Sequence, residues 1–406
     1  MDGIRFEGVP EESALVETLV DWAETPSGSD EAGGLARMAE KLRAAFADLP
    51  GEGELVELPP AADLGGAPVP VGAAYRHRCR PEAPVRVLLS GHMDTVYGPD
   101  HPFKRCTFPE RGVLRGPGVA DMKGGLVIMR HAINLLESSP HAGNLGWEVL
   151  INADEEIGSP GSRGLLRESA QRNTVGLVFE SALPDGSLVR RRKGSGVFRA
   201  AARGRAAHTG RDFEDGRNAI IALSGLLVRL HSLNDTVPGA IVNVGRARGG
   251  RAVNVVPDFA EAFVNIRISK AEDLPDLNAQ IENLLKVANK EEGIHIEWHG
   301  EMARPPKSET PATEQLHEWY ADIAREHGID CSQRDTGGAS DGNILAAEGL
   351  PHLDGVGARG GRIHSEEEFI LTASLPERIA LAGAFLRRLA DPATEFPRDL
   401  FRMTQS

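Results

Sequence analysis

The chain contains several short apolar runs that each end in a histidine or an acid, and this feature constrains the fold most. Val87-Leu-Leu-Ser-Gly-His92 ends in a histidine, Trp147-Glu-Val-Leu-Ile-Asn-Ala153 is followed by three acids, and Val175-Gly-Leu-Val-Phe-Glu180 ends in a glutamate. Apolar runs of this length, stopped by polar residues, predict buried strands. Because parallel strands of an α/β sheet bring their carboxyl ends to one edge, we expect these polar side chains to converge there.

Two further acids extend the pattern. Asp94 follows His92 by two residues, so the alternation of an extended chain puts both side chains on one side, where Asp94 could orient the imidazole ring. Asp121 lies among the glycines of Gly116-Pro-Gly-Val-Ala-Asp-Met-Lys-Gly-Gly125, which predict a loop before a helix over 126–136. Each acid alone also has a structural explanation, since Asp94 could cap a turn and Asp121 a helix.

Three consecutive acids, Asp154, Glu155 and Glu156, follow the second apolar run. Their mutual repulsion is hard to explain by stability but natural around a cation, although a solvated acidic turn is the alternative. Glu155 and Glu156, together with His92, Asp121 and Glu180, form a set of imidazole and oxygen ligands without thiolate. Such a set suits zinc, and also manganese or cobalt, and it leaves one carboxylate for acid–base chemistry.

Length and composition limit the classes of protein. A chain of 406 residues, 41% hydrophobic and 26% charged, predicts a globular protein of two domains. The formal charge of −14 argues against nucleic acid as a partner. No stretch has the length of a membrane span and the first residues lack a secretory layout, so we expect a cytoplasmic protein without membrane contact. The three cysteines, Cys79, Cys106 and Cys331, are too few and too scattered for a disulfide framework.

The middle of the chain differs in pattern from its flanks. Strands are predicted over 196–203, 241–244, 260–268 and 294–298, with helices over 219–230 and 273–290, an order typical of helices on one face of an antiparallel sheet. We therefore expect an α/β fold: a mixed-sheet catalytic domain with helices on both faces, formed by residues 1–189 and 304–406, and an inserted α+β domain at 190–303. The basic run Arg190 to Lys193 lies at the junction and is either solvated or attracts acidic substrates.

Four motifs resemble the zinc-site motifs of the M20 family of peptidases and deacylases, most of all its glutamate carboxypeptidase branch. They are Gly91-His-Met-Asp-Thr-Val96, Gly118-Val-Ala-Asp-Met-Lys-Gly124, Ala153-Asp-Glu-Glu-Ile-Gly-Ser159 and Ile363-His-Ser-Glu-Glu-Glu-Phe369. The resemblance implies two divalent metal ions, with zinc expected and cobalt or manganese possible. It makes His92 and Glu180 ligands of one ion, Glu156 and His364 ligands of the other, and Asp121 the bridge.

The resemblance also implies roles for other residues. Glu155 becomes the general base, Asp94 orients His92, and a cis peptide bond follows Asp121. The inserted domain is expected to act as a lid and dimer interface. There His208 is expected to stabilise the oxyanion, often across a dimer, whereas an exposed loop histidine is the structural alternative.

Substrate contacts are expected from residues of both domains. The resemblance assigns them to Asn254, Arg267, Gly337, Gly338 and Ser340, with Arg267 binding a substrate carboxylate through its planar guanidinium. A surface ion pair is the alternative for Arg267. In addition, Arg359 or Arg362 stands where the glutamate carboxypeptidases mostly have glycine, and Ile363 precedes the histidine where an aromatic residue is usual.

These observations predict an enzyme that cleaves an amide bond next to a free carboxylate and releases an amino acid from a dipeptide or an N-acyl amino acid. The resemblance alone implies that it is a homodimer. An N-acyl amino acid deacylase or a carbamoyl-type amidohydrolase on the same scaffold is the alternative. An inactive metal-binding interaction module is a third possibility. The presence of Glu155, which no ligand set requires, speaks against that third class.

Overall fold

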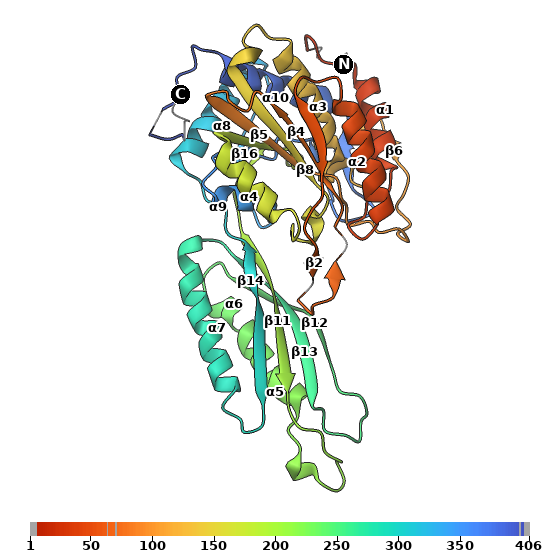
Figure 1. Ribbon diagram of the computed structural model, residues 1–406, viewed down its shortest axis with the longest axis vertical. Coiled ribbons are helices and arrows are strands. Elements are labelled where there is room, and N and C mark those ends of the chain that lie inside the picture. The colour runs from red at the N-terminus through yellow and green to blue at the C-terminus, as the bar shows by residue number, and fades with distance from the viewer. Residues whose placement is uncertain (1–5, 63, 70, 398, 402–406) are drawn as a thin grey trace.

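The protein, described by a computed structural model, consists of two bodies joined end to end (Figure 1). The structure describes residues 6–62, 64–69, 71–397 and 399–401. The first and last parts of the chain form the larger body, here called the main domain. Residues between Gly194 and Arg304 form the smaller body, here called the inserted domain.

A mixed six-stranded sheet lies at the centre of the main domain. Its order is β1 (Glu52–Val56), β4 (Ala74–Cys79), β8 (Leu145–Asn152), β5 (Val85–His92), β9 (Val175–Val178) and β16 (His352–Asp354). β8, β5, β9 and β16 run parallel, whereas β4 runs antiparallel to both of its neighbours, β8 and β1. The carboxyl ends of β8, β5 and β9 therefore lie side by side at one edge of the sheet, as the apolar runs predict.

Helices cover both faces of this sheet. One face carries α1 (Glu12–Ala23), α2 (Ala32–Phe46), α3 (Gly124–Glu137), α8 (Pro311–Glu326) and α10 (Ser374–Ala390), and the other carries α4 (Arg163–Arg172) and α9 (Asp341–Ala347). Alternation along β5 sends Val87 and Leu89 into the larger core and Leu88 into the smaller one. The predicted mixed-sheet α/β fold is confirmed. Among the described residues, no helix combines the length and apolar character needed to cross a membrane.

Short elements surround the sheet edge. A small sheet of β17 (Gly360–Gly361), β18 (Phe369–Leu371), β7 (Val113–Arg115) and β6 (Thr107–Glu110) brings the segment around His364 next to the loop that contains Asp121. Two further pairs are β10 (Leu188–Arg192) with β15 (Gln333–Thr336), and β2 (Ala61–Ala62) with β3 (Pro68–Val69). Short helical turns occur at Val119–Lys123, Ala142–Asn144, Glu155–Ile157, Phe213–Asp215 and Ala271–Asp273.

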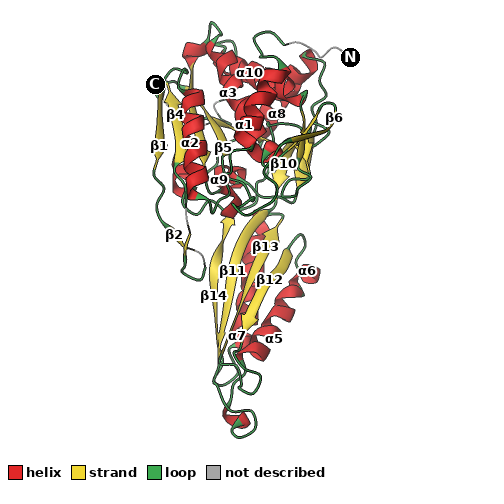
Figure 2. Cartoon of the chain, turned by 90° about the vertical axis from the view of Figure 1, so that its right-hand side faces the viewer, coloured by secondary structure: helices red, strands yellow, loops and turns green. Residues whose placement is uncertain are grey.

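The inserted domain is an antiparallel sheet with helices on one face (Figure 2). Its strands lie in the order β12 (Ile241–Gly249), β13 (Phe259–Ile268), β11 (Gly194–Arg203) and β14 (His295–Arg304). The helices α5 (Ala219–His231), α6 (Leu233–Thr236) and α7 (Leu274–Ala288) enclose a separate apolar core against that face. This arrangement matches the pattern of strands and helices expected for the middle of the chain.

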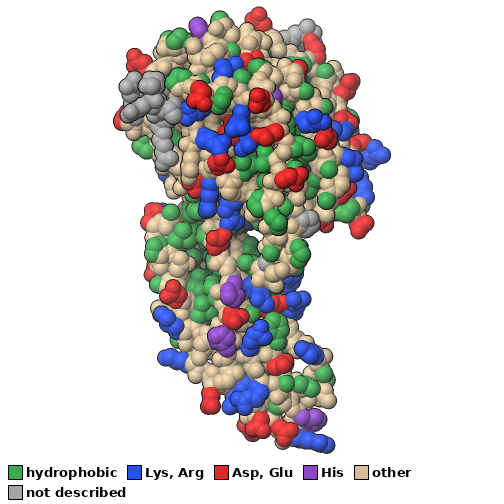
Figure 3. Space-filling view, viewed as in Figure 1, with side chains coloured by type: hydrophobic (Ala, Val, Ile, Leu, Met, Phe, Trp, Pro, Cys, Tyr) green, Lys and Arg blue, Asp and Glu red, His purple; other side chains and the backbone are tan. Residues whose placement is uncertain are grey.

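The two connections between the domains pair with each other. The N–H of Arg192 donates to the carbonyl of Lys307 (3.2 Å), and the N–H of Lys307 donates back (3.0 Å). The buried guanidinium of Arg192 binds Asp354 through two bonds of 2.7 and 2.6 Å. Basic side chains gather where the two bodies meet (Figure 3). Arg190 and Arg191 pair with Asp335 and Glu309, so each arginine of the predicted basic run has an acidic partner.

Candidate metal centre

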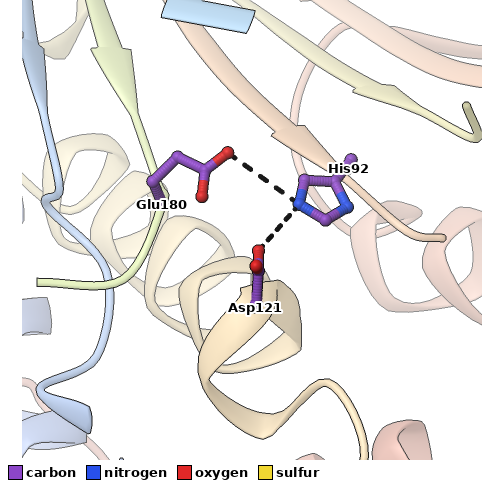
Figure 4. Close-up of side chains that lie close together, drawn as sticks. All are labelled: His92, Asp121 and Glu180. Carbon is purple, nitrogen blue, oxygen red and sulfur yellow. Dashed lines mark hydrogen bonds and ion pairs between the residues drawn. The ribbon is translucent and has the colours of Figure 1, made fainter. Parts of the chain in front are cut away.

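Three predicted ligands meet at the carboxyl edge of the main sheet (Figure 4). His92 is the last residue of β5, Glu180 follows β9, and Asp121 lies in the helical turn before α3. The Nε2 atom of His92 is 3.1 Å from Asp121 Oδ1 and 3.9 Å from Glu180 Oε1. All three side chains are buried, and their ligand atoms lie within 4.8 Å of one another. One cation fits between them.

A second trio shares Asp121. The Nε2 atom of His364 lies 3.2 Å from Asp121 Oδ2 and 3.1 Å from Glu156 Oε2. Asp121 thus directs one carboxylate oxygen to each histidine. His364 lies in the loop between β17 and β18, and its side chain is 50% exposed, so this half of the centre faces solvent. The geometry brings all five predicted ligands together, and the donor set of imidazole and carboxylate groups suits a pair of divalent cations.

Electrostatics also favours cations at this edge. Burial raises the pKa of Glu180 to about 8, and the nearby charge of Asp121 adds to the shift. Burial likewise raises the pKa of Glu155 well above its usual range, against the attraction of Arg304. The hydrogen bonds of His364 with Asp121 and Glu156 raise its pKa to about 10. Burial thus disfavours the charged forms of the two glutamates, and a cation bound at this edge would favour them.

Asp94 lies beside His92 but has more partners than predicted. His92 Nδ1 is 3.0 Å from the backbone carbonyl of Asp94 and 3.4 Å from its Oδ1 atom. The carboxylate also accepts the N–H groups of Glu155 and Glu156, both at 3.1 Å, and the hydroxyl of Ser29 at 2.8 Å. Asp94 therefore fixes the turn that carries two other residues of the site, in addition to facing His92.

Glu155 belongs to neither trio of ligands. Its side chain is buried at the same edge, and its Oε1 atom lies 2.8 Å from Nη2 of Arg304. A buried carboxylate beside two cation positions, and not needed to bind either, has the placement that a general base requires.

Sequence reasoning missed Glu368 and Arg304. The buried carboxylate of Glu368 accepts the N–H groups of Gly118 (3.2 Å), Ala120 (2.9 Å) and Asp121 (3.0 Å), and Tyr97 Oη lies 2.7 Å away. It thus holds the loop of Asp121, in which the expected cis peptide bond to Met122 is present. Three successive glutamates precede β18, and nothing in their order shows which one is buried. Arg304 carries no motif either.

Arg267 and the glycine loop lie together where the domains meet. Nη1 of Arg267 donates to the carbonyl of Gly337 (2.7 Å), and Gly338 follows in the same loop. Ser340 is buried, and its hydroxyl accepts the N–H of Gly342 (3.1 Å) at the start of α9. The hydroxyl of Ser340 therefore has a structural partner, whereas Arg267 and Gly337 lie at the domain boundary.

His208 and Asn254 lie at the opposite end of the inserted domain. Both are exposed, in loops joined by a bond from the Thr209 N–H to the Asn254 carbonyl (3.2 Å). They lie beyond the far end of β11 (Figure 1), and a ten-residue strand spans about 30 Å. The structure therefore does not bring them to the metal centre of their own chain.

Arg359 and Arg362 each have an acidic partner. Arg359 binds Glu377 (3.3 Å) and the carbonyl of Pro184, which ties the chain before His364 to α10. Arg362 pairs with Glu367 on the exposed surface of the His364 loop.

Two trios of possible metal ligands around one shared aspartate are an arrangement typical of metal-dependent hydrolases with two cations. The chain belongs to peptidase family M20/M25/M40, because the sequence pattern of this family matches residues 88–388. The resemblance drawn from the four motifs is confirmed, and the protein is a metallopeptidase of that family.

Individual relatives support this assignment. The chain is 27% identical to carboxypeptidase G2 of Pseudomonas sp. (strain RS-16) over 393 residues, which cover 96% of this chain and 92% of the relative. Its fold is similar to that of an M20 family metallo-carboxypeptidase from Sulfolobus solfataricus, with a TM-score of 0.70, 17% identity, and 93% and 99% of the two chains covered. It is also similar to a dinuclear metal binding peptidase of Bacillus subtilis, with a TM-score of 0.64, 15% identity, and coverage of 93% and 97%.

Proposed function

We propose that the protein is a two-metal carboxypeptidase that releases an amino acid from a small substrate with a free carboxylate. The observation that carries this proposal is the position of Asp121, whose two oxygens face two different histidines. His92 and Glu180 would bind one cation, and Glu156 and His364 the other. Zinc suits this donor set, as do cobalt and manganese. When bound, two such cations supply a more acidic water and polarise the scissile carbonyl.

Other residues of the chain would transfer the proton, orient the ligands and bind the substrate. Glu155 takes a proton from the attacking water and gives it to the leaving amine. Asp94 orients His92 and fixes the turn of Glu155 and Glu156. The guanidinium of Arg267, beside Gly337 at the domain boundary, anchors the substrate carboxylate through its planar fork. Similarity to a carboxypeptidase over almost the whole chain supports this choice over a deacylase or a carbamoyl-type amidohydrolase. The buried Glu155, surplus to both trios, argues against an inactive binding module.

A substrate panel tests the proposal. The chelated enzyme would be reloaded with zinc, cobalt or manganese and given dipeptides and N-acyl amino acids, each with a free and with an amidated carboxyl end. We expect hydrolysis of the free acids only. Equal hydrolysis of the amidated compounds would contradict the carboxylate anchor.

The role of Arg267 has its own control. Arg267→Met should raise KM by about tenfold or more, as loss of a charged hydrogen bond does. Arg325→Met removes an exposed arginine of α8 in the main domain and should leave KM unchanged. A similar KM for both variants would remove Arg267 from the substrate site.

The exposed side of the inserted domain supports a homodimer. β12 is an edge strand, and α5 exposes Ile221 (68%) and Val228 (72%) to solvent. An open strand edge beside apolar side chains suits an isologous contact with a second copy. Such a dimer would let His208 and Asn254 reach the partner's metal centre.

Light scattering tests for this dimer. The wild type should be a dimer, and Val228→Asp should dissociate it, whereas Val287→Asp on α7 should leave it intact. A monomeric wild type would contradict the proposal.

A cytoplasmic location and the absence of nucleic acid and membrane partners stay predictions from the sequence. The free state of Cys79, Cys106 and Cys331 accords with a reducing compartment.

A further inference from the structure

Arg304 is the last residue of β14, yet its side chain lies in the metal centre. Its side chain is 11% exposed. One nitrogen, Nη2, lies 2.8 Å from Glu155 Oε1 and 2.7 Å from the backbone carbonyl of Glu155. The same nitrogen lies 3.1 Å from Ser159 Oγ and 3.3 Å from Asp341 Oδ1. A residue of the inserted domain thus reaches the proposed base, the turn that carries it and the start of α9.

These contacts fix one side of the Glu155 carboxylate. Oε1 is held by the guanidinium, and the bond to the backbone carbonyl holds the turn Glu155–Ile157 in place. The other charged groups close to Glu155 are His92 and the acids Glu180 and Asp341. Arg304 therefore balances repulsion that would otherwise push the carboxylate of Glu155 out of the centre.

The backbone of Arg304 belongs to the inserted domain. In the sheet it pairs with Ser195 of β11. After it come Pro305 and Pro306, two residues with fixed φ, and then Lys307, which pairs with Arg192 at the junction. A rotation of the inserted domain about this junction moves Arg304 directly. Another interdomain ion pair, Arg163 with Glu301, does not touch Glu155.

We propose that Arg304 is a positioning residue that places the carboxylate of Glu155 for proton transfer and makes this placement depend on the orientation of the inserted domain. The proposal rests on the proposed function, in which Glu155 is the base. Arg304 itself binds neither substrate nor metal in this scheme. It differs in this respect from Arg267, which lies on β13 and faces the glycine loop.

Kinetics of Arg304→Met and of a control variant test the proposal. Arg304→Met should lower kcat by about a hundredfold, since a misplacement of 1 Å can cost that much. KM should stay within about threefold of the wild type, because a positioning residue does not bind substrate. A large rise in KM with kcat retained would overturn the proposal. Arg163→Met removes the other interdomain ion pair and should keep kcat near the wild-type value; an equal loss there would show that Arg304 only docks the domain.

A second substitution of Arg304 keeps the proposal testable if Arg304→Met does not fold. Arg304→Lys keeps the buried charge, but an ammonium group cannot hold the same set of partners. Its kcat should fall by about tenfold. A wild-type kcat in Arg304→Lys would overturn the proposal, and this variant decides alone if Arg304→Met fails to fold.

A double variant shows whether Arg304 acts through Glu155 or contacts the reacting groups itself. If Arg304 acts through Glu155, the residual rate of Glu155→Gln should not fall further when Arg304→Met is added. A further fall of about tenfold or more would mean that Arg304 acts independently of the base.

Crystal structures distinguish failure of this proposal from failure of the proposed function. If the metal-loaded wild type hydrolyses none of the panel, the proposed function fails. A crystal structure of Arg304→Met grown with metal then decides whether Arg304 positions the carboxylate of Glu155. A carboxylate of Glu155 displaced by about 1 Å or more supports the link, and an unmoved carboxylate overturns it.

Discussion

Glu155 and Glu156 are neighbours in one helical turn, yet their carboxylates face different partners. Glu156 faces His364 and the shared Asp121, whereas Glu155 faces Arg304. Both backbone N–H groups donate to the one carboxylate of Asp94, which fixes the direction in which each side chain leaves the turn. At the scale of single residues, this divergence would separate metal binding by Glu156 from proton transfer by Glu155 in the proposed mechanism.

The first prediction contrasts these neighbours. Glu155→Gln should lower turnover by about 10²- to 10⁴-fold, the range of general base catalysis, while two metal ions per chain remain bound. Glu156→Gln should lower the metal content. Metal analysis after dialysis and turnover at saturating substrate measure both effects. A Glu155→Gln enzyme that keeps its activity would refute the proposed mechanism.

The second prediction concerns Lys307, which is buried at the domain junction. Burial lowers its pKa to about 8, although its ammonium donates to the carbonyls of Val189 (3.0 Å) and Arg190 (2.7 Å). Between pH 8 and the ordinary lysine pKa of about 10.4, the unfolded chain binds more protons at this residue than the folded chain. The free energy of unfolding therefore gains a contribution that rises with pH in this window, by up to about 1.4 kcal/mol per pH unit.

Denaturant titrations of the wild type and Lys307→Met from pH 7 to 10 measure this contribution. The difference in unfolding free energy between them should be flat below pH 8 and should grow in favour of the wild type above it. A difference that does not change with pH would show that this ammonium is solvated in the folded state.

Among the elements, the loop before α3 depends on a carboxylate from a distant strand. Glu368 accepts three N–H groups of the segment 118–121 and thereby holds Asp121 between the two histidines. Hydrogen bonds to a charged group contribute about 1.5–3 kcal/mol each. The conformation of this loop therefore depends on Glu368, which directly precedes β18 and is distant in the sequence.

The third prediction follows from these bonds. Glu368→Gln should lower the unfolding free energy by about 2–4 kcal/mol, because an amide cannot accept all the bonds of a carboxylate. It should also weaken metal binding in a chelator competition. Glu367→Gln removes only an exposed ion pair with Arg362 and should cost at most about 1 kcal/mol. Equal losses for the two variants would contradict the role of Glu368.

Local sequence pattern was enough to predict that the candidate ligands lie close together, as they do in the structure. They follow apolar runs or stand in glycine-rich loops, so strand periodicity and the parallel sheet bring them to one edge. Sequence reasoning could not find Glu368 or Arg304, because their roles come from partners far away in the chain. Ser340 shows a related limit: its hydroxyl caps α9, and the pattern that suggests a substrate contact also suits a cap.

At the scale of the whole molecule, His208 lies far from the metal centre of its own chain, although its proposed role is to stabilise the oxyanion at such a centre. Within one chain it lies at the end of the inserted domain remote from the main domain, so the proposed role requires a second copy. The sequence pattern could suggest the residue but not this distance, since the direction of β11 relative to the main domain depends on the junction.

The fourth prediction tests this sharing of residues. Glu155→Gln and His208→Ala should each be nearly inactive. In a dimer of one chain of each variant, one of the two centres is complete. It combines Glu155 of the His208→Ala chain with His208 of the Glu155→Gln chain. Mixed at equal amounts with free exchange, they should regain about a quarter of the wild-type rate. Variants that stay inactive after proven exchange of subunits would exclude a role for His208 across the dimer.

The order of the ligands along the chain has a consequence for biosynthesis. His92, Asp121, Glu156 and Glu180 leave the ribosome before the inserted domain, whereas His364 and Glu368 follow it. Synthesis proceeds at about 5–20 residues per second, and the inserted domain, with its own core, can fold during this interval. An unfinished chain can offer a cation only the trio around His92. In the proposed two-metal scheme, the second cation position would therefore be completed last, and full loading with metal would be a late event in the maturation of the enzyme.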